Sequence, residues 1–360
     1  CVYTRNQVKG SPILVTQQHV ANGTAHAILC NSGNANTCNA DGVEKAETIC
    51  RLAADRLGID AADILIASTG VIGQPLPLEP IAQEMGALIG RLSTHGGSDA
   101  AEAIMTTDTL RKECAVRFSV NGVSCVLGGM AKGSGMIHPN MATMLVFLTT
   151  DCAITAPMLQ KALSSDVPDS FNMVSVDGDT STNDMVSLLA NGAAQNPLID
   201  SEGAAYDAFC AALGTVTRLL CRAIAGDGEG ASKLLECVVS DAPDTATAKI
   251  AAKSVITSSL VKTAMFGEDA NWGRILCALG YADCVLDVSK IEVSLRSAKG
   301  SLLVCERGAG VAFSEEKAAE ILHEAEISID VSLHAGNATA TAWGCDLTHG
   351  YVTINGDYRT

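Results

Sequence analysis

Apolar residues recur along the chain with two spacings, and these spacings divide it into predicted helices and strands. Residues 43–57 place an apolar side chain at every third or fourth position, which is the period of a helix, and Gly58 stands where helices commonly end. Short apolar runs at 13–16, 26–30 and 63–67 are typical of strands instead. The first part of the chain is therefore expected to mix both kinds of element.

The middle of the chain is predicted to contain a hairpin, followed by a loop that leads into a buried strand. Residues 114–120 and 123–127 flank Asn121-Gly122, a dipeptide that favours a two-residue hairpin turn. A glycine-rich stretch at 128–140 comes next. It runs into the apolar segment 143–148, which has the continuous pattern of a strand with both faces buried.

Helical spacing recurs in both halves of the chain. We expect helices at 78–92, 98–105, 157–165, 180–194, 203–224, 246–258, 271–280 and 314–325, a strand at 232–239, and three strands at the end. Strands and helices do not alternate strictly, which predicts an α+β fold with a layered αββα-type core. A polar stretch with a proline, Ser240–Thr245, divides the prediction into a core at 1–240 and a smaller α/β domain at 241–360.

Composition narrows the function classes. The 360 residues are 48% apolar with a formal net charge of −16, so we expect a globular protein that does not bind nucleic acid, whose phosphates its surface would repel. We see no apolar run near the ~20 residues that span a membrane. The 14 Cys and 7 His form no C-x-x-C and no helical His pair, so we expect no metal site and a reducing, cytoplasmic location.

The glycine-rich loop that ends in Ala142-Thr143 has the chemistry that self-cleavage requires. A threonine hydroxyl is a weak nucleophile until a base activates it, and a small residue before it leaves its carbonyl accessible. After cleavage, the α-amine of Thr143 is a base on the nucleophile's own residue, with an unperturbed pKa near ~7.7–8.0. Taken alone, the segment fits a glycine turn that feeds a core strand better than a cleavage site.

Two other segments have a possible functional interpretation and a simpler one. The predicted strand at 63–67 leads into Ser68-Thr69-Gly70, where backbone N–H groups and a hydroxyl can stabilise an oxyanion. Alternating glycines around Glu229 let the backbone approach a ligand while the carboxylate projects. Either segment alone could be an ordinary turn. The polar run Asp179–Thr182 is interpreted as a helix N-cap that also lines a cleft.

Together with Val261–Arg274 and Tyr351–Thr360, these segments resemble the glutamate N-acetyltransferase (ornithine acetyltransferase) family of arginine biosynthesis over nearly the whole chain. The resemblance implies the layered fold of self-cleaving aminopeptidases and ornithine acetyltransferases. It implies cleavage between Ala142 and Thr143, with Thr143 as the nucleophile and with Thr69 and Gly70 stabilising the oxyanion. The substrate-binding positions that it implies are Thr106, Lys132, Thr143, Glu229, Asn355 and Thr360.

The resemblance also implies a ping-pong reaction. Thr143 would take an acetyl group from N2-acetylornithine and pass it to glutamate, with acetyl-CoA as a further candidate donor and no other cofactor. Two cleaved chains would form an αβ heterotetramer. Two alternatives remain open at this point: an aminopeptidase of the same fold, in which water replaces glutamate, and a non-catalytic amino-acid-binding protein.

Overall fold

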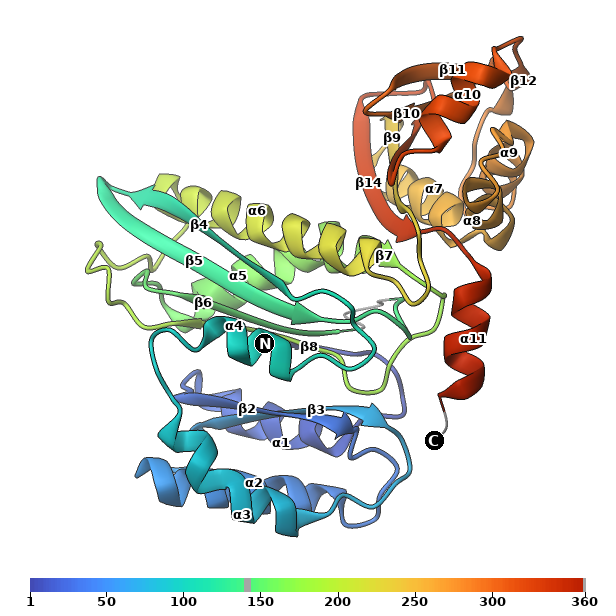
Figure 1. Ribbon diagram of the computed structural model, residues 1–360. Helices are drawn as coiled ribbons and strands as arrows, with labels where there is room; N and C mark the ends of the chain where they lie inside the picture. The colour runs from blue at the N-terminus through green and yellow to red at the C-terminus, as the bar shows by residue number, and fades with distance from the viewer. Residues whose placement is uncertain (139–143, 359–360) are drawn as a thin grey trace.

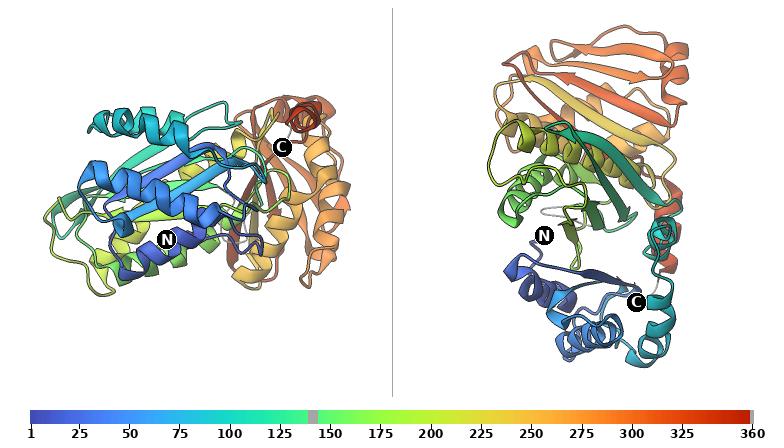
Figure 2. Two further views of the ribbon diagram at one scale, coloured as in Figure 1. Left: turned by 90° about the horizontal axis from the view of Figure 1, so that it is seen from below. Right: turned by 90° about the vertical axis from the view of Figure 1, so that its left-hand side faces the viewer.

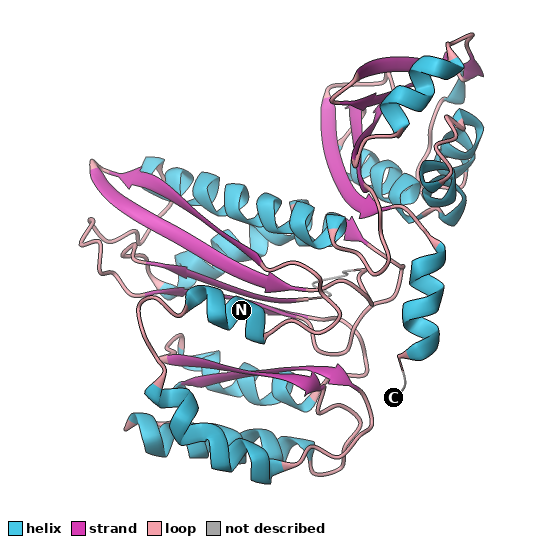
Figure 3. Cartoon of the chain, viewed as in Figure 1, coloured by secondary structure: helices cyan, strands magenta, loops and turns pink. Residues whose placement is uncertain are grey.

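The computed structural model describes residues 1–138 and 144–358. The chain forms a large layered unit and a C-terminal unit beside one end of it, as Figure 1 shows. Mixed helices and sheets make up both units, so the α+β prediction is confirmed. Figure 3 shows helices on the two outer sides of the layered unit and strands between them.

The upper sheet of the layered unit has five strands in the order β1-β8-β6-β5-β4. Its strands β6 and β8 are parallel, and the other neighbours are antiparallel. The predicted hairpin joins β4 to β5 through Asn121 and Gly122, which have φ values of 51° and 85°. The strand bounds are β1 Val2–Tyr3, β4 Lys112–Val120, β5 Val123–Lys132, β6 Leu145–Thr150 and β8 Met185–Ala190.

Helices α5 (Ala156–Asp166) and α6 (Ala204–Gly226) cover the outer face of this sheet. Among the described residues, α6 is the one helix that is long enough and apolar enough to cross a membrane. The sequence pattern did not suggest this. Half of its apolar window is buried in the protein, and Phe209, Leu213 and Val216 pack in the core. That burial is typical of the core helix of a layered fold.

A second sheet of two parallel strands, β2 (Ala27–Asn34) and β3 (Ile64–Val71), lies on the other side. An apolar cluster that includes Ala67, Phe147 and Met185 fills the space between the two sheets. Another cluster joins β3 to the helices below it. Those helices are α1 Ser11–His19, α2 Gly42–Leu57 and α3 Leu78–Gly90, and α4 Gly97–Ala103 lies at the side.

The C-terminal unit is built on a seven-stranded sheet in the order β12-β11-β10-β13-β9-β14-β7. The strand β9 of this sheet spans Leu234–Ala242 and so crosses the domain boundary predicted after residue 240. The other strands are β7 Val174–Ser175, β10 Glu292–Ser297, β11 Gly300–Glu306, β12 Ala309–Gly310, β13 Glu326–Ser332 and β14 Ala338–Cys345. The helices are α7 Thr245–Thr257, α8 Ser259–Phe266, α9 Trp272–Gly280 and α10 Glu315–Leu322. Figure 2 shows this unit stacked on the layers.

Four predicted segments differ from the structure. Residues 128–132 of the predicted glycine-rich loop continue the strand β5, where they pair with β4 and β6. Residues 13–16 lie in α1, because Pro12 stands in the first turn of a helix that begins at Ser11. Residues 180–194 hold the strand β8 rather than a helix, because β8 lies between two strands, and a short buried apolar run does not reveal its period. Asp179–Thr182 therefore caps no helix. The last predicted strand is the helix α11 (His349–Asp357), which returns toward the layered unit.

Candidate active site

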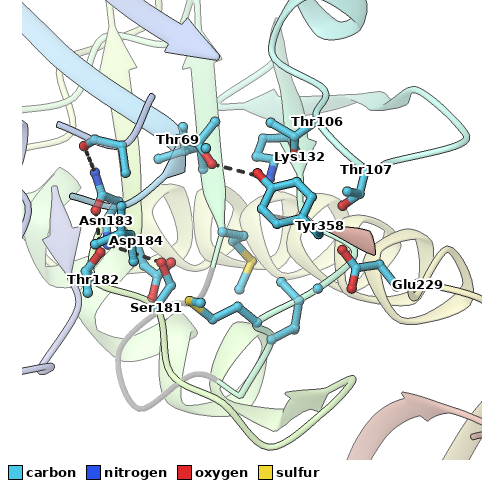
Figure 4. A pocket seen from close by; sticks show the side chains of 18 of the residues that line it. Thr69, Thr106, Thr107, Lys132, Ser181, Thr182, Asn183, Asp184, Glu229 and Tyr358 are labelled. Carbon is cyan, nitrogen blue, oxygen red and sulfur yellow. Dashed lines mark hydrogen bonds between the residues drawn. The ribbon is translucent and has the colours of Figure 1, made fainter. Parts of the chain in front are cut away.

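A cavity of about 140 Å³ opens where the carboxyl ends of β3 and β5 meet, and it collects residues from widely separated parts of the chain. The predicted positions Thr69, Gly70, Thr106, Lys132, Glu229 and Asn355 all line it. Figure 4 shows most of these side chains around one space. The predicted residues Ala142, Thr143 and Thr360 lie outside the described residues. Met144, which follows Thr143 in the chain, lines the cavity.

Thr69 and Gly70 form the end of β3, next to the paired strand β2. Gly70 has a φ of 125°, which side chains rarely adopt, and a Cβ there would lie 2.3 Å from the carbonyl carbon of Gly33. Glycine is therefore required at position 70. The Thr69 hydroxyl accepts a 3.5 Å hydrogen bond from Nζ of Lys132 across the cavity.

Lys132 ends β5, and its side chain is only 9% exposed. Burial lowers the pKa of this lysine, and the carboxylate of Asp108, 3.9 Å from Nζ, partly opposes that shift. Among the described residues, the Thr69 hydroxyl at 3.5 Å and the Asp108 carboxylate at 3.9 Å contact this ammonium. Such a group is well placed to bind the carboxylate of a ligand.

A network of buried charges supports Lys132 from behind. Nζ of Lys112 lies 2.6 Å from Oδ1 of Asp108 and 2.5 Å from Oδ2 of Asp227. Asp108 also accepts hydrogen bonds from the backbone N–H groups of Gly133, at 2.7 Å, and Thr106, at 3.1 Å. Burial alone would raise the Asp108 pKa, but Lys132 and Lys112 outweigh it and hold the pKa below its usual range. The network fixes the loop that carries Thr106.

The opposite wall of the cavity carries Glu229. A Cβ on Gly135 would lie 2.3 Å from the Glu229 carboxyl carbon, so a glycine at 135 gives this side chain its room. Nδ2 of Asn355, on α11, donates a 2.7 Å hydrogen bond to Oε2 of Glu229. The Thr348 hydroxyl ties the start of the same helix to the carbonyl of Gly230 at 2.5 Å. The C-terminal helix thereby closes one side of the site.

Asp177 holds the loop that precedes the predicted cleavage bond. Its carboxylate accepts hydrogen bonds from the backbone N–H groups of Met136 and Ile137 at 2.6 and 2.9 Å. Burial raises the pKa of Asp177, and these two bonds oppose that shift. The Thr180 hydroxyl binds the carbonyl of His138 at 2.8 Å. The run around Asp179 therefore fixes the loop, a role that sequence analysis did not assign.

Asn183 and Asp184 lie at the start of β8 and line the cavity, but their place in a predicted helix concealed them. Nδ2 of Asn183 donates to the carbonyls of Ala35 and Ser68 at 2.6 and 2.9 Å, which joins the two sheets. Burial raises the pKa of Asp184 well above its usual range, although Ser181 and Lys132 oppose the shift. The sequence offered no signal for either residue beyond their polarity.

No group of three or more His, Cys, Asp or Glu side chains suited to a metal ion occurs among residues 1–138 and 144–358. The site instead offers an ammonium, two carboxyl groups and several hydroxyls. This set can bind a ligand that carries both charges and can stabilise an oxyanion near Thr69.

Comparisons with known proteins agree with one another. A sequence model of the ArgJ family matches residues 1–360. The arginine biosynthesis bifunctional protein ArgJ of Caldanaerobacter subterraneus subsp. tengcongensis is 49% identical over 360 residues, which cover 100% of this chain and 89% of that protein. Its namesake in Symbiobacterium thermophilum is 51% identical with the same coverage.

A solved structure is also similar. The crystal structure of arginine biosynthesis bifunctional protein ArgJ from Bacillus halodurans is 43% identical with a TM-score of 0.56, and the match covers 59% of this chain and 98% of that one. The family match over every residue and the relatives about half identical over the full length lead to one conclusion: the chain belongs to the ArgJ family.

Proposed function

We propose that the chain transfers an acetyl group from N2-acetylornithine to glutamate through an acetyl ester of Thr143, after it has cleaved itself between Ala142 and Thr143. Membership of the ArgJ family makes it a bifunctional enzyme of arginine biosynthesis, with glutamate N-acetyltransferase and amino-acid N-acetyltransferase activities. The observation that carries the finer proposal is the convergence of Thr69, Gly70, Lys132 and Glu229 on one cavity beside Met144.

The two opposite charges of the cavity suit an amino acid with a charged side chain. Lys132 would bind the α-carboxylate that acetylornithine and glutamate share. Glu229 would bind the side-chain ammonium of ornithine, with Asn355 holding the carboxylate in place. Thr106 lines the cavity between these poles and can hydrogen-bond the ligand backbone.

In self-cleavage, the Thr143 hydroxyl attacks the Ala142 carbonyl, the C–N bond breaks, and the nitrogen takes up the hydroxyl proton. Water then hydrolyses the ester, which releases the Ala142 carboxylate and restores the Thr143 hydroxyl beside the α-amine that the first step formed. The oxygen that becomes negative in each tetrahedral intermediate would be stabilised at Thr69 and Gly70, where one donor can be worth ~3–4 kcal/mol. The same two residues would serve acetyl transfer.

In acetyl transfer, the Thr143 oxygen forms a bond to the acetyl carbon of acetylornithine while the C–N bond breaks. Ornithine leaves with the proton that the hydroxyl gives up through the α-amine. Glutamate then attacks the ester, takes the acetyl group and returns a proton to the Thr143 oxygen. We include acetyl-CoA as an alternative donor, no other cofactor, and a pair of cleaved chains assembled as an αβ heterotetramer with the layered fold of self-cleaving aminopeptidases.

Intact-mass analysis of the protein and of Thr143→Ala tests this proposal. We expect the protein to consist of two fragments split between 142 and 143, and Thr143→Ala to stay in one piece and to lack transfer activity. Assays with glutamate as acceptor then compare acetylornithine and acetyl-CoA as donors. Cleavage of the Thr143→Ala chain at the same bond would show that another nucleophile acts. Release of free acetate in place of acetylglutamate would favour a hydrolase.

A further inference from the structure

The ammonium of Lys132 lies near a carboxylate that it does not reach. Its Nζ is 3.9 Å from Oδ2 of Asp108, whereas a hydrogen bond between an ammonium and a carboxylate is ~2.7–2.9 Å long. The Asp108 side chain is fully buried, and that of Lys132 is 9% exposed. Opposite charges attract strongly where water is largely excluded, so the gap indicates that Asp108 is held elsewhere.

Other donors hold the carboxylate of Asp108. Its Oδ1 accepts hydrogen bonds from Nζ of Lys112 at 2.6 Å and from the backbone N–H of Gly133 at 2.7 Å. Its Oδ2 accepts a third from the backbone N–H of Thr106 at 3.1 Å. The carboxylate can approach Lys132 only if one of these bonds is weakened. The bond from Lys112 is the strongest of the three, because its donor carries a full charge.

Lys112 is itself fixed between two carboxylates. Its Nζ also lies 2.5 Å from Oδ2 of Asp227, and its side chain is 1% exposed. Asp227 in turn accepts hydrogen bonds from the backbone N–H groups of Thr109 and Leu110 at 3.0 and 3.3 Å. A buried cation that leaves either anion gives up a strong interaction, so Lys112 stays on Asp108.

We propose that Lys112 is a positioning residue: by holding Asp108, it keeps the ammonium of Lys132 available for the carboxylate of the substrate. The inference rests on the proposed function, in which Lys132 binds the α-carboxylate that acetylornithine and glutamate share. Lys112 acts through Asp108 and need not touch either substrate. Figure 4 shows the Lys132 side chain among those that line the cavity.

Replacing Lys112 would turn Asp108 into a competitor of the substrate. A movement of about 1 Å brings the Lys132 ammonium and the Asp108 carboxylate into hydrogen-bond contact. The substrate carboxylate would then have to displace an internal carboxylate that is always present. Because both substrates carry this group, both should bind more weakly by the same factor.

The charge of Lys132 should respond as well. Burial lowers the pKa of Lys132, Asp108 opposes that shift, and the positive charge of Lys112 adds to it. Replacing Lys112 should raise this pKa, because a positive neighbour is lost and Asp108 comes closer. Other titratable groups that face Lys132 stay in place. They are Cys30 on β2, Asp184 before β8, and Glu229 and Tyr358 on the far side of the cavity.

Lys112→Met tests the proposal, with Lys233→Met as its matched control. Lys233 is also a buried lysine in an ion pair, 3.2 Å from Oε1 of Glu268, but its Nζ binds the C-terminal unit. In Lys112→Met, KM for acetylornithine and KM for glutamate should rise together by about 10-fold or more, while kcat changes less than about twofold. In Lys233→Met, neither KM should rise.

A second readout needs no enzyme activity. Acetic anhydride labels only the neutral form of an amine, so the pH dependence of labelling at Lys132, followed by peptide mass spectrometry, reports the loss of its charge. The midpoint should rise by about 1 pH unit or more in Lys112→Met and stay in place in Lys233→Met.

The double variant Lys112→Met/Asp108→Asn separates this role from simple damage to the fold. An asparagine at position 108 carries no charge to capture Lys132, so both KM values and the labelling midpoint should return toward those of the wild type. General loosening of the site predicts a further loss instead. A double variant no better than Lys112→Met would therefore overturn the proposal.

Asp227→Asn covers the case in which Lys112→Met does not fold. The asparagine keeps an acceptor for the N–H groups of Thr109 and Leu110 but removes the charge that competes for Lys112. Lys112 should then bind Asp108 more firmly, so the labelling midpoint of Lys132 should not rise. A raised midpoint together with a joint increase of both KM values would overturn the proposal.

The remaining outcomes are distinct from one another. Folded Lys112→Met protein with both KM values and the midpoint of the wild type would overturn the proposal and leave the proposed function intact. An increase of KM for acetylornithine alone would also overturn it, because the shared carboxylate would not be involved. Wild-type protein that transfers no acetyl group would contradict the proposed function itself, while the labelling midpoints would still show whether Lys112 holds Asp108.

Discussion

The two walls of the cavity differ in how they hold their charge. On the β5 wall, Lys132 is buried, and Asp108 and Lys112 form ion pairs behind it with side chains no more than 1% exposed. On the opposite wall, Glu229 is half-buried, and its partner Asn355 is exposed on a helix from the end of the chain. One wall is a fixed part of the core, and the other is a surface contact.

This difference matches what the two proposed substrates share and what they do not. Acetylornithine and glutamate both carry an α-carboxylate, which a fixed, poorly hydrated ammonium can bind in one geometry. Their side chains have opposite charges, so the wall that meets them must tolerate both. A carboxylate that is in contact with water and is held by one amide of a terminal helix binds a charged ligand less strongly than a buried ammonium does. It can, however, adjust its position to different side chains. We therefore expect the buried wall to set affinity and the exposed wall to discriminate.

Lys112→Met should have the largest effect, a loss of folding stability, because it removes the cation of the buried ion pairs behind Lys132. The substitution leaves the carboxylates of Asp108 and Asp227 without their closest cation, and losing one partner of a buried pair costs about 3–5 kcal/mol. Urea denaturation measures the free energy of unfolding. The exposed pair of Lys161 with Glu202 provides the control, since Lys161→Met should cost less than about 1 kcal/mol. Equal losses would remove the distinction between the walls.

Glu229→Gln should come next and should separate the two substrates. The variant loses the charge that faces the ornithine ammonium, and hydrogen bonds to charged groups are worth about 1.5–3 kcal/mol, so KM for acetylornithine should rise about 10-fold or more. KM for glutamate should change little. The surface substitution Glu202→Gln serves as control. Matching changes in both KM values would refute the ammonium-binding role of Glu229.

Asn355→Ala should weaken the same wall by a smaller amount. It removes one 2.7 Å hydrogen bond to a partly exposed carboxylate, for which a loss of about 0.5–1.5 kcal/mol, or 2–12-fold in KM for acetylornithine, is expected. Thr353→Ala, an exposed substitution on the same helix, controls for disturbance of α11. A loss of all activity in Asn355→Ala would mean that α11 belongs to the catalytic machinery rather than to a specificity wall.

The smallest effect should be the change of KM with pH that results from the titration of Lys132. Burial lowers the pKa of this lysine, so as the pH rises its positive charge is lost at a lower pH than that of an ordinary lysine. KM for both substrates should then increase together on the alkaline side. In Lys132→Arg the increase should disappear, because arginine keeps its charge throughout that range. An alkaline increase for acetylornithine alone would place the effect on the other wall.

The predicted site residues that lie in short continuous segments line one cavity in the structure. Thr69 and Glu229 stand in glycine-containing stretches that were singled out for their local chemistry, whereas Lys132 was named through the family resemblance. The hairpin turn at Asn121-Gly122 was equally local, since its left-handed backbone follows from the two residue types.

The residues that sequence reasoning missed depend on contacts between distant segments. Asp108 acquires its role from Lys112 and Asp227, more than a hundred residues apart along the chain, and no local pattern predicts that meeting. Asp184 was hidden because β8 is buried on both sides and so lacks the alternation of an exposed strand. The helix α11 was expected as a strand, since its β-branched residues have strand propensity; the structure shows a helix instead, capped by the Thr348 side chain and with no buried residue.

The measurement that tests the central claim most directly is the mass of each fragment after incubation with N2-acetylornithine in the absence of glutamate. We expect a cleaved chain in which the fragment that begins at Thr143 gains one acetyl group, carried on that residue, and loses it when glutamate is added. A chain that remains whole, or a fragment 143–360 that never carries the acetyl group while transfer proceeds, would contradict the account.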